Sequence, residues 1–187
     1  MLPGVSRVGA LLAVIAAGLL GCAGAPPQPA RLALRLAPAT LGTSLSLQQH
    51  LMVVRQGRVD ELDAALEVDA ERLDMVGFAL GQRILALHYD GHSLQSWRHP
   101  LVPEQLRGED VLEDLQLTLW PIETIETALP AGWTIAENGR RRTLRLLDQP
   151  VMVIDYTSEP RWSGKIELNN LRYHYRLTIE SVSNTPE

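Results

Sequence analysis

Hydrophobic and polar residues alternate along most of the chain from Leu45 onward. Between residues 61 and 69, apolar side chains fill the even positions and acidic side chains fill most of the odd ones. A period of two is typical of a strand with one buried face and one face in water. The pattern predicts strands near residues 44–55, 58–69, 72–79, 82–89, 93–98, 133–137, 140–147, 150–157, 164–169 and 171–182.

Turn signals separate these runs. Asp90-Gly91 and Asn138-Gly139 are favoured hairpin dipeptides, and Gln56-Gly57 marks a further turn. Successive strands joined by short hairpins form one antiparallel sheet, and ten strands tend to curl or close because each strand twists relative to its neighbour.

One segment in the middle of the chain changes to a helical period. Leu112, Leu115 and Leu119 follow the spacing i, i+3, i+7, which is one stripe of an amphipathic helix. Pro121 ends this helix and opens a second short one, in which the spacing recurs over residues 122–129.

The expected fold class is therefore mainly β (α+β). We expect a curled antiparallel sheet that forms an incomplete half-barrel, with the mid-chain helices as a lid over its concave face. The alternative is a fully closed up-and-down barrel of the lipocalin type.

The first thirty residues are typical of an exported, acylated protein. Residues 1–7 carry one basic side chain, and Val8–Leu20 is an uncharged apolar run, shorter than the about 20 residues of a membrane-spanning helix. Leu19 stands three positions before the only cysteine, Cys22, and a glycine directly precedes it, which resembles the bacterial lipobox. We expect residues 1–21 to be a signal peptide and Cys22 to be lipidated. The alternative is an ordinary signal peptide followed by an incidental cysteine.

The residues after the cysteine predict where the protein resides. Ala23, not aspartate, follows Cys22, which by resemblance to the sorting rules of Gram-negative lipoproteins favours the periplasmic face of the outer membrane. Acyl chains on Cys22 would anchor the protein in membrane lipid. Residues 22–40 are expected to be the lipidated cysteine and a Pro-rich tether, and residues 41–187 the folded domain.

Composition narrows the function classes. A chain of 187 residues is long enough for one domain with a sizeable core. It has 17 basic and 22 acidic residues, a net charge of −5 that becomes −6 once residues 1–21 and their Arg7 are removed. This acidic balance argues against a nucleic-acid partner. The lone cysteine excludes an intrachain disulfide and a multi-cysteine metal site.

An acylated cysteine, a Pro-rich tether, antiparallel strands and a helical insert together resemble the LolA/LolB group of lipoprotein carriers and receptors. More narrowly, Phe78–Leu85 followed by Tyr89–Gly91, and Leu129–Trp133 ahead of a basic strand and Asn169-Asn170, resemble a family of uncharacterised bacterial lipoproteins. The genes of that family are often found beside aryl-polyene biosynthesis genes.

The LolA/LolB resemblance implies an apolar cavity beneath the lid that holds an acylated cargo, and a periplasmic carrier protein as a possible partner. The apolar faces of sheet and helix supply the expected cavity lining, which is Leu62, Leu66, Val68, Leu112, Leu115, Leu119, Tyr173, Tyr175 and Leu177.

The same resemblance implies an exposed apolar loop that contacts the membrane. Here it points to Phe78 and Leu80, between two glycines that would let the loop project. The alternative places both residues at buried strand ends, with a bulge at Gly81.

Candidate chemistry elsewhere is sparse. His88 and His92 have no third metal ligand nearby, and Ser93 lacks the closing glycine of a nucleophile elbow, so neither a metal nor catalysis is expected. The acidic residues of the helix are expected on its solvated face. They are Glu109, Asp110, Glu113 and Asp114.

The remaining candidate binding residues are a run of arginines and four tryptophans. Arg140, Arg141 and Arg142, with Arg145, are typical of a solvated hairpin edge, and the sharper interpretation is that they contact anionic lipid headgroups. Trp97, Trp120, Trp133 and Trp162 lie near element ends, where they either pack in the core or line a cavity mouth.

The leading hypothesis is thus an outer-membrane lipoprotein that binds an acylated molecule in an apolar cavity and helps to deliver it, without a cofactor and without catalysis. The cargo is a lipoprotein or a lipid, an aryl-polyene lipid included. The alternatives are a non-carrying envelope scaffold and, third, a hydrolase or transferase acting on envelope lipids.

Overall fold

The computed structural model describes residues 32–102 and 106–183. The described residues belong to one compact unit of the chain. The predicted signal peptide and the lipidation of Cys22 lie outside the described residues.

Along the chain, a short 3-10 helix is followed by five strands, two helices and five more strands. Their bounds are η2 Pro38–Leu41, β1 Leu45–Arg55, β2 Arg58–Val68, β3 Leu73–Ala79, β4 Gln82–Tyr89, β5 Leu94–Arg98, α1 Gly108–Leu119, α2 Ile122–Ala128, β6 Trp133–Asn138, β7 Arg141–Leu146, β8 Gln149–Tyr156, β9 Gly164–Asn170 and β10 Tyr175–Ser183. Nine of the predicted strands agree with these bounds to within one residue at either end.

The last predicted strand begins too early. Residues 171–174 form a turn between β9 and β10, and His174 in that turn has a φ of 54°. The turn could not be recognised from the sequence, because apolar and polar side chains alternate through residues 171–174 in the same phase as in β10.

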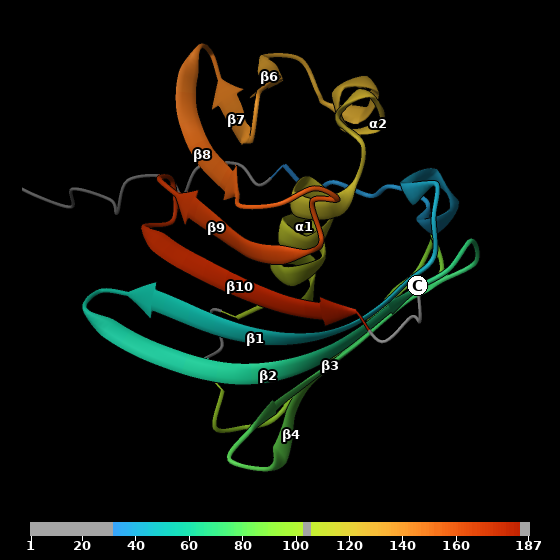
Figure 1. Ribbon diagram of the computed structural model, residues 1–187, viewed down its shortest axis with the longest axis vertical. Helices are drawn as coiled ribbons and strands as arrows, with labels where there is room; N and C mark the ends of the chain where they lie inside the picture. Colours follow the sequence, from blue (N-terminus) through green and yellow to red (C-terminus); the bar gives the residue numbers. More distant parts are fainter. Residues whose placement is uncertain (1–31, 103–105, 184–187) are drawn as a thin grey trace, which may run out of the picture. The chain divides into compact units, whose positions relative to one another are not determined.

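All ten strands form one antiparallel sheet in the order β5-β4-β3-β2-β1-β10-β9-β8-β7-β6. The first and last strands of the domain meet in the middle, where Leu51 of β1 lies opposite Ile179 of β10. β5 and β6 are the two edges, so the sheet is not closed and the closed-barrel alternative is wrong. Figure 1 shows the sheet curving around α1.

The alternation in the sequence sorts side chains between the two faces of this sheet. On β2, Ala64, Leu66 and Val68 are buried on the concave face, whereas Asp63 and Glu67 are exposed. Equivalent positions on the other strands join them in one hydrophobic core. The core therefore lies in the hollow of the sheet, where α1 covers it.

Candidate functional site

Helix α1 is buried on more than one side. Leu112, Leu117 and Trp120 are fully enclosed, and the polar Gln116 and Thr118 between them are enclosed as well. An amphipathic surface helix buries one stripe only, so a second layer must cover α1. The start of the helix lies tightly against β5, because a Cβ at Gly108 would stand 2.5 Å from the Cβ of Ser96.

The second layer is a strap, residues 32–41, that runs along α1 and ends in η2. Leu32, Leu34 and Leu36 are buried with the core. The side-chain amide of Gln116 makes two hydrogen bonds with the backbone of Leu36, as a neighbouring strand would. Leu36 N donates to Gln116 Oε1 at 3.1 Å, and Gln116 Nε2 donates to Leu36 O at 2.9 Å. The part of the predicted tether that the structure describes, residues 32–40, is thus integrated into the folded domain.

A buried arginine holds the C-terminal end of α1. Arg142 of β7 has no exposed surface, and its Nη1 donates to the carbonyls of Leu117 at 2.6 Å and Trp120 at 3.0 Å. The last carbonyls of a helix lack partners within the helix, so these donors satisfy groups that burial would otherwise leave unpaired.

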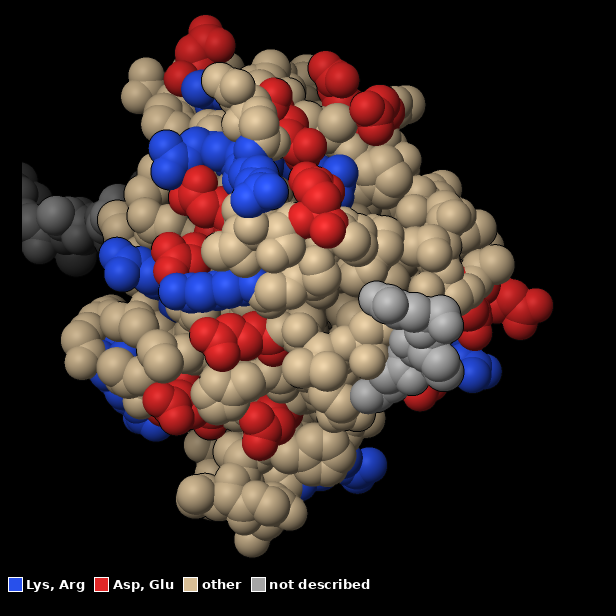
Figure 2. Space-filling model, viewed as in Figure 1, with Lys and Arg blue, Asp and Glu red and all other residues tan. Residues whose placement is uncertain are grey.

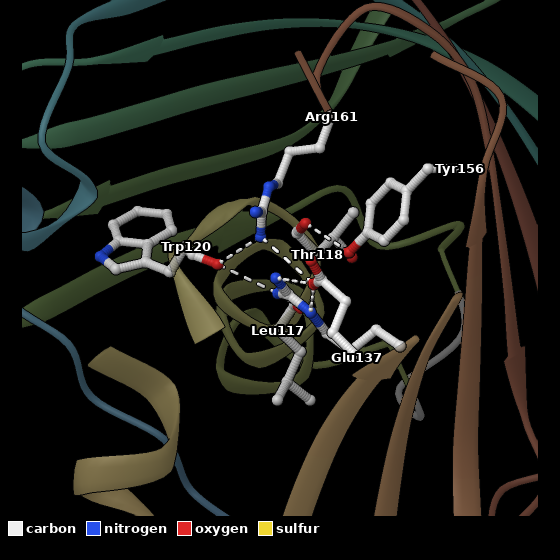
Figure 3. A network of polar contacts seen from close by, with 7 residues as sticks. Leu117, Thr118, Trp120, Glu137, Tyr156 and Arg161 are labelled. Carbon is white, nitrogen blue, oxygen red and sulfur yellow. Dashed lines mark hydrogen bonds and ion pairs between the residues drawn. The ribbon is translucent and has the colours of Figure 1, made fainter. Parts of the chain in front are cut away.

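Three further side chains complete this arrangement, which we call the Arg142 network (Figure 3). Glu137 of β6 pairs with Arg142 at 2.7 Å and so balances its buried charge. Arg161 donates to the Trp120 carbonyl at 3.0 Å, and Tyr156 of β8 donates to the Thr118 carbonyl at 2.8 Å. These donors bind the backbone carbonyls at the end of α1, so the contact does not depend on the side chains of the helix.

A carboxyl group fixes the opposite side of α1. Tyr175 of β10 donates to Oδ2 of Asp114 at 2.5 Å, and Asn170 of β9 donates to the Tyr175 hydroxyl at 3.1 Å. The pKa of Asp114 is raised to about 7, because burial and, to a smaller extent, the nearby Glu113 raise it more than the hydrogen bond from Tyr175 lowers it. Burial and the nearby Asp114 also raise the pKa of Tyr175.

The acidic residues of α1 thus depart from the sequence prediction. Glu113 is buried and accepts a bond from Ala33 N of the strap at 2.8 Å, and Asp114 faces β10. Glu109 and Asp110 are half-buried near the start of the helix. The solvated face was wrong for Glu113 and Asp114 because α1 lies between the sheet and the strap.

The expected lining residues lie together, but they fill the space they were expected to enclose. Leu66, Val68, Leu112, Leu115 and Leu119 are buried members of the one core. Leu62, Tyr175 and Leu177 pack against it, and Tyr173 is half-buried in the turn before β10. Contact of an acyl chain with these residues stays a prediction.

The cavities found among the described residues do not form a trough under α1. A cleft of about 380 Å³ lies beside β5 at the start of α1, next to Trp97, Arg98 and Arg107. A space of about 10 Å³ lies near Glu113 and Arg172. Entry of a long hydrocarbon chain into the hollow of the sheet therefore requires α1 to move.

The predicted membrane loop is a tight turn. Leu80 and Gly81 join β3 to β4, with a φ of 51° at Leu80, whose side chain is fully exposed. The alternative of a buried strand end is therefore wrong for Leu80. Phe78 is 39 % exposed, and the sheet register shifts between Gly77 and Phe78. Contact of this loop with a membrane stays a prediction.

The basic run divides between the two faces of β7. Arg140 donates to the Thr157 carbonyl and Arg141 pairs with Asp155, both on the exposed surface. Arg142 turns inward with Leu144, which corrects its expected contact with headgroups. The inward position follows from the strand period, because residues two apart share a face.

The tryptophans also divide. Trp120 is fully buried, and its Nε1 donates to Thr40 Oγ1 of η2 at 3.0 Å. Trp133 and Trp162 pack at the margin of the core, and Trp97 is 42 % exposed beneath the guanidinium of Arg83.

The other candidate residues are placed apart from α1. His88 bonds Asp74 on the neighbouring strand, and the backbone amides of His92 and Ser93 bond Asp90 within the turn before β5. Within residues 32–102 and 106–183, no three His, Cys, Asp or Glu side chains are grouped as metal ligands. Nor does that part of the chain contain a helix with the length and apolarity needed to cross a membrane.

Sequence reasoning missed four residues that hold α1 in place, namely Gln116, Tyr156, Arg161 and Asn170, and it assigned Arg142 a different role. One signal was available for the strap, since Leu32, Leu34 and Leu36 alternate with Ala33, Arg35 and Ala37 as in a strand with one buried face.

Two solved structures are similar to this fold. A DUF1329 family protein from Desulfovibrio piger has a TM-score of 0.40 at 10 % identity, with 81 % of this chain and 88 % of that chain covered. A LolA superfamily protein from Nitrosomonas europaea has a TM-score of 0.38 at 10 % identity, with 82 % and 92 % covered.

No curated protein matches the sequence. Residues 46–183 match the family described as a protein of unknown function, DUF3261. The match extends from β1 to β10 and includes both helices and the Arg142 network. This chain is therefore a member of the DUF3261 family.

Proposed function

We propose that the protein is an outer-membrane lipoprotein, anchored through Cys22 on the periplasmic face, that binds an acylated molecule and helps to deliver it to the membrane. The acyl chain takes the place of α1 on the concave face of the sheet. The cargo is a lipoprotein or a lipid, an aryl-polyene lipid included, and a periplasmic carrier protein hands it over. No catalytic step is part of this proposal.

The observation that carries the proposal is that α1 forms a separate layer over an unclosed sheet. No strand hydrogen bonds depend on the helix, because the sheet pairs continuously from β5 to β6 without it. Displacing α1 breaks the bonds of the Arg142 network, the Asp114–Tyr175 contact and the strap contacts, and it exposes the buried leucines of the sheet. The sheet keeps its hydrogen bonds in both states.

The energetics make such an exchange reversible. Burial of a leucine side chain contributes about 1.5–3 kcal/mol, so the four buried leucines of α1 contribute about 6–12 kcal/mol. An acyl chain of about 15 methylenes gains about 12 kcal/mol on the same scale. Because the two apolar gains are similar, an acyl chain offsets the loss of the leucine contacts, and the polar contacts of α1 then favour return of the helix when the cargo leaves.

Removing one hydroxyl group that holds α1 on the sheet tests this exchange. Tyr156→Phe removes the bond to the Thr118 carbonyl but keeps the ring packing, and a typical hydrogen bond contributes about 1 kcal/mol. We expect the variant to bind a fluorescent fatty acid about fivefold more tightly than the wild type. Tyr89→Phe is the matched control, since it loses a bond of the same kind to Gly91 O that does not involve α1, and its affinity should equal that of the wild type.

A second candidate function is a non-carrying envelope scaffold, and the filled interior favours it. The scaffold needs no acyl exchange. Wild type and Tyr156→Phe would then both fail to bind the fatty acid, native mass spectrometry of the purified protein would find no lipid, and crosslinking would return protein partners only. That set of results would contradict the carrier proposal.

A further inference from the structure

We infer that one end of the sheet, formed by the β1–β2 and β9–β10 turns, docks on an anionic lipid bilayer. We call residues 54–59 and 169–176 the basic turn pair. The inference rests on the arginines of this surface, which make none of the contacts that the proposed cargo exchange breaks, so each can fail without the other.

The two turns of the basic turn pair lie side by side. β1 pairs with β10 from Leu47, opposite Ser183, to Arg55, opposite Tyr175. The end of β1 therefore lies next to the start of β10. Figure 1 shows both turns at the left margin of the molecule. They therefore form one continuous surface although they are more than a hundred residues apart in the sequence.

The charge of this surface contrasts with that of the chain. The basic turn pair contains four arginines, one histidine and no acidic residue, whereas the chain as a whole has a net charge of −5. Arg55, Arg58 and Arg176 are exposed, and Figure 2 shows basic side chains at the same left margin. Exposed arginines near an anionic bilayer are attracted to its phosphates.

The arginines of the β1–β2 turn are only partly balanced within the fold, because Arg58 pairs with Asp60 at 2.7 Å in an exposed ion pair while Arg55 lies next to Arg58. Arg55 and Arg58 are direct cross-strand partners at the β1–β2 turn, and like charges placed opposite each other destabilise a sheet. Val59, next to Arg58, and Leu171, in the other turn, are 53 % and 38 % exposed. Paired cations flanked by exposed apolar side chains match a bilayer surface, which offers phosphates above hydrocarbon.

The start of the described chain lies at the same end. Ala33 N donates to Glu113 Oε2, and Glu113 borders the same small space as Arg172 and Tyr173 of the β9–β10 turn. Ten residues, 23–32, separate Ala33 from Cys22 and would span about 33 Å if fully extended. An acyl anchor on Cys22 can thus reach a bilayer that touches the basic turn pair.

The earlier expectation of headgroup contact at Arg140–Arg142 concerns the other end of the strands. Those arginines follow the β6–β7 turn, whereas the β7–β8 turn is at the end that holds the basic turn pair. One flat bilayer cannot meet both ends of the sheet, so Arg140 and Arg141 provide the matched control.

The test measures co-sedimentation of the full chain carrying Cys22→Ser with vesicles of phosphatidylglycerol and phosphatidylcholine (3:7) and of phosphatidylcholine alone. Residues 1–21 with their Arg7 are the same in every variant, so their contribution cancels when the affinity ratios of the variants are compared. Arg55→Ser with Arg58→Ser should lower the preference for anionic vesicles about 25-fold, because each arginine near the surface contributes about fivefold. Arg140→Ser with Arg141→Ser should change it less than twofold.

Two outcomes overturn the inference: the wild-type chain shows no preference for anionic vesicles, or both double variants lose it equally. Thermal unfolding of Arg55→Ser/Arg58→Ser should occur close to the wild-type temperature, because the variant loses a like-charge pair together with the exposed Arg58–Asp60 pair, so unfolding cannot account for the loss. Fatty-acid binding by the same variant should equal that of the wild type, which separates this inference from the cargo proposal.

Discussion

Replacing Arg142 by methionine is expected to lower the free energy of unfolding by about 3 kcal/mol, the lower end of the cost of removing one partner from a buried ion pair. The substitution leaves the carbonyls of Leu117 and Trp120 without these donors and Glu137 without its closest cation. Glu137 keeps Arg161 at 3.7 Å and a side chain that is 26 % exposed, which limits the loss. Urea denaturation with two-state analysis measures the change.

Arg141 provides the control for this prediction. It is the neighbour of Arg142 on the same strand, but its pair with Asp155 is exposed, and exposed pairs contribute about 0–1 kcal/mol. Arg141→Met should therefore unfold within about 1 kcal/mol of the wild type. Adding Glu137→Gln to Arg142→Met should recover part of the loss, because no carboxylate is then left without its partner. An Arg142→Met protein as stable as Arg141→Met would contradict the role of the Arg142 network.

Replacing Asp114 by asparagine is expected to stabilise the protein at high pH only. Burial raises the pKa of Asp114 to about 7, above its ordinary value of 3.8, so the folded state holds the proton more tightly than the unfolded state. The free energy of unfolding therefore falls as pH rises from about 4 to about 7 and remains at the lower value above that range. The amide of asparagine keeps an acceptor for Tyr175 and carries no charge.

The expected gain at pH 8 is about 2–4 kcal/mol, from a shift of about three pKa units reduced by the partial exposure of Asp114. At pH 4 the two proteins should be equally stable. Urea denaturation at a series of pH values measures the difference. Tyr175→Phe provides a second test: it removes the bond that lowers the pKa of Asp114 in the folded state, so the upper limit of this pH range should rise while its lower limit stays the same. A gain from Asp114→Asn that is the same at every pH would contradict this assignment.

The sheet was predictable because its chemistry is local. Strand alternation and turn dipeptides depend on neighbouring residues, so the strand bounds agree to within one residue outside the turn at residues 171–174. The limits of α1 were predictable for the same reason, since Gly108 and Pro121 delimit the stripe of leucines.

The fastening of α1 was not predictable, because it depends on contacts between distant segments. Gln116 bonds a strap 80 residues earlier in the chain, and Asp114 bonds Tyr175, 61 residues later. A one-sided helical pattern says nothing of a second covering layer, so Glu113 and Asp114 were placed in solvent. Arg142 was misplaced because its run of three arginines was interpreted as one surface, although adjacent residues of a strand face opposite ways.

Hydrogen–deuterium exchange tests most directly the claim that an acyl chain replaces α1 on the sheet. With saturating fatty acid, the amides of residues 112–120 should exchange faster than in the free protein, while those of Ile166 to Leu168 on β9 keep their protection. Unchanged or slower exchange in residues 112–120 under the same conditions would show that the helix stays in place and would contradict the account.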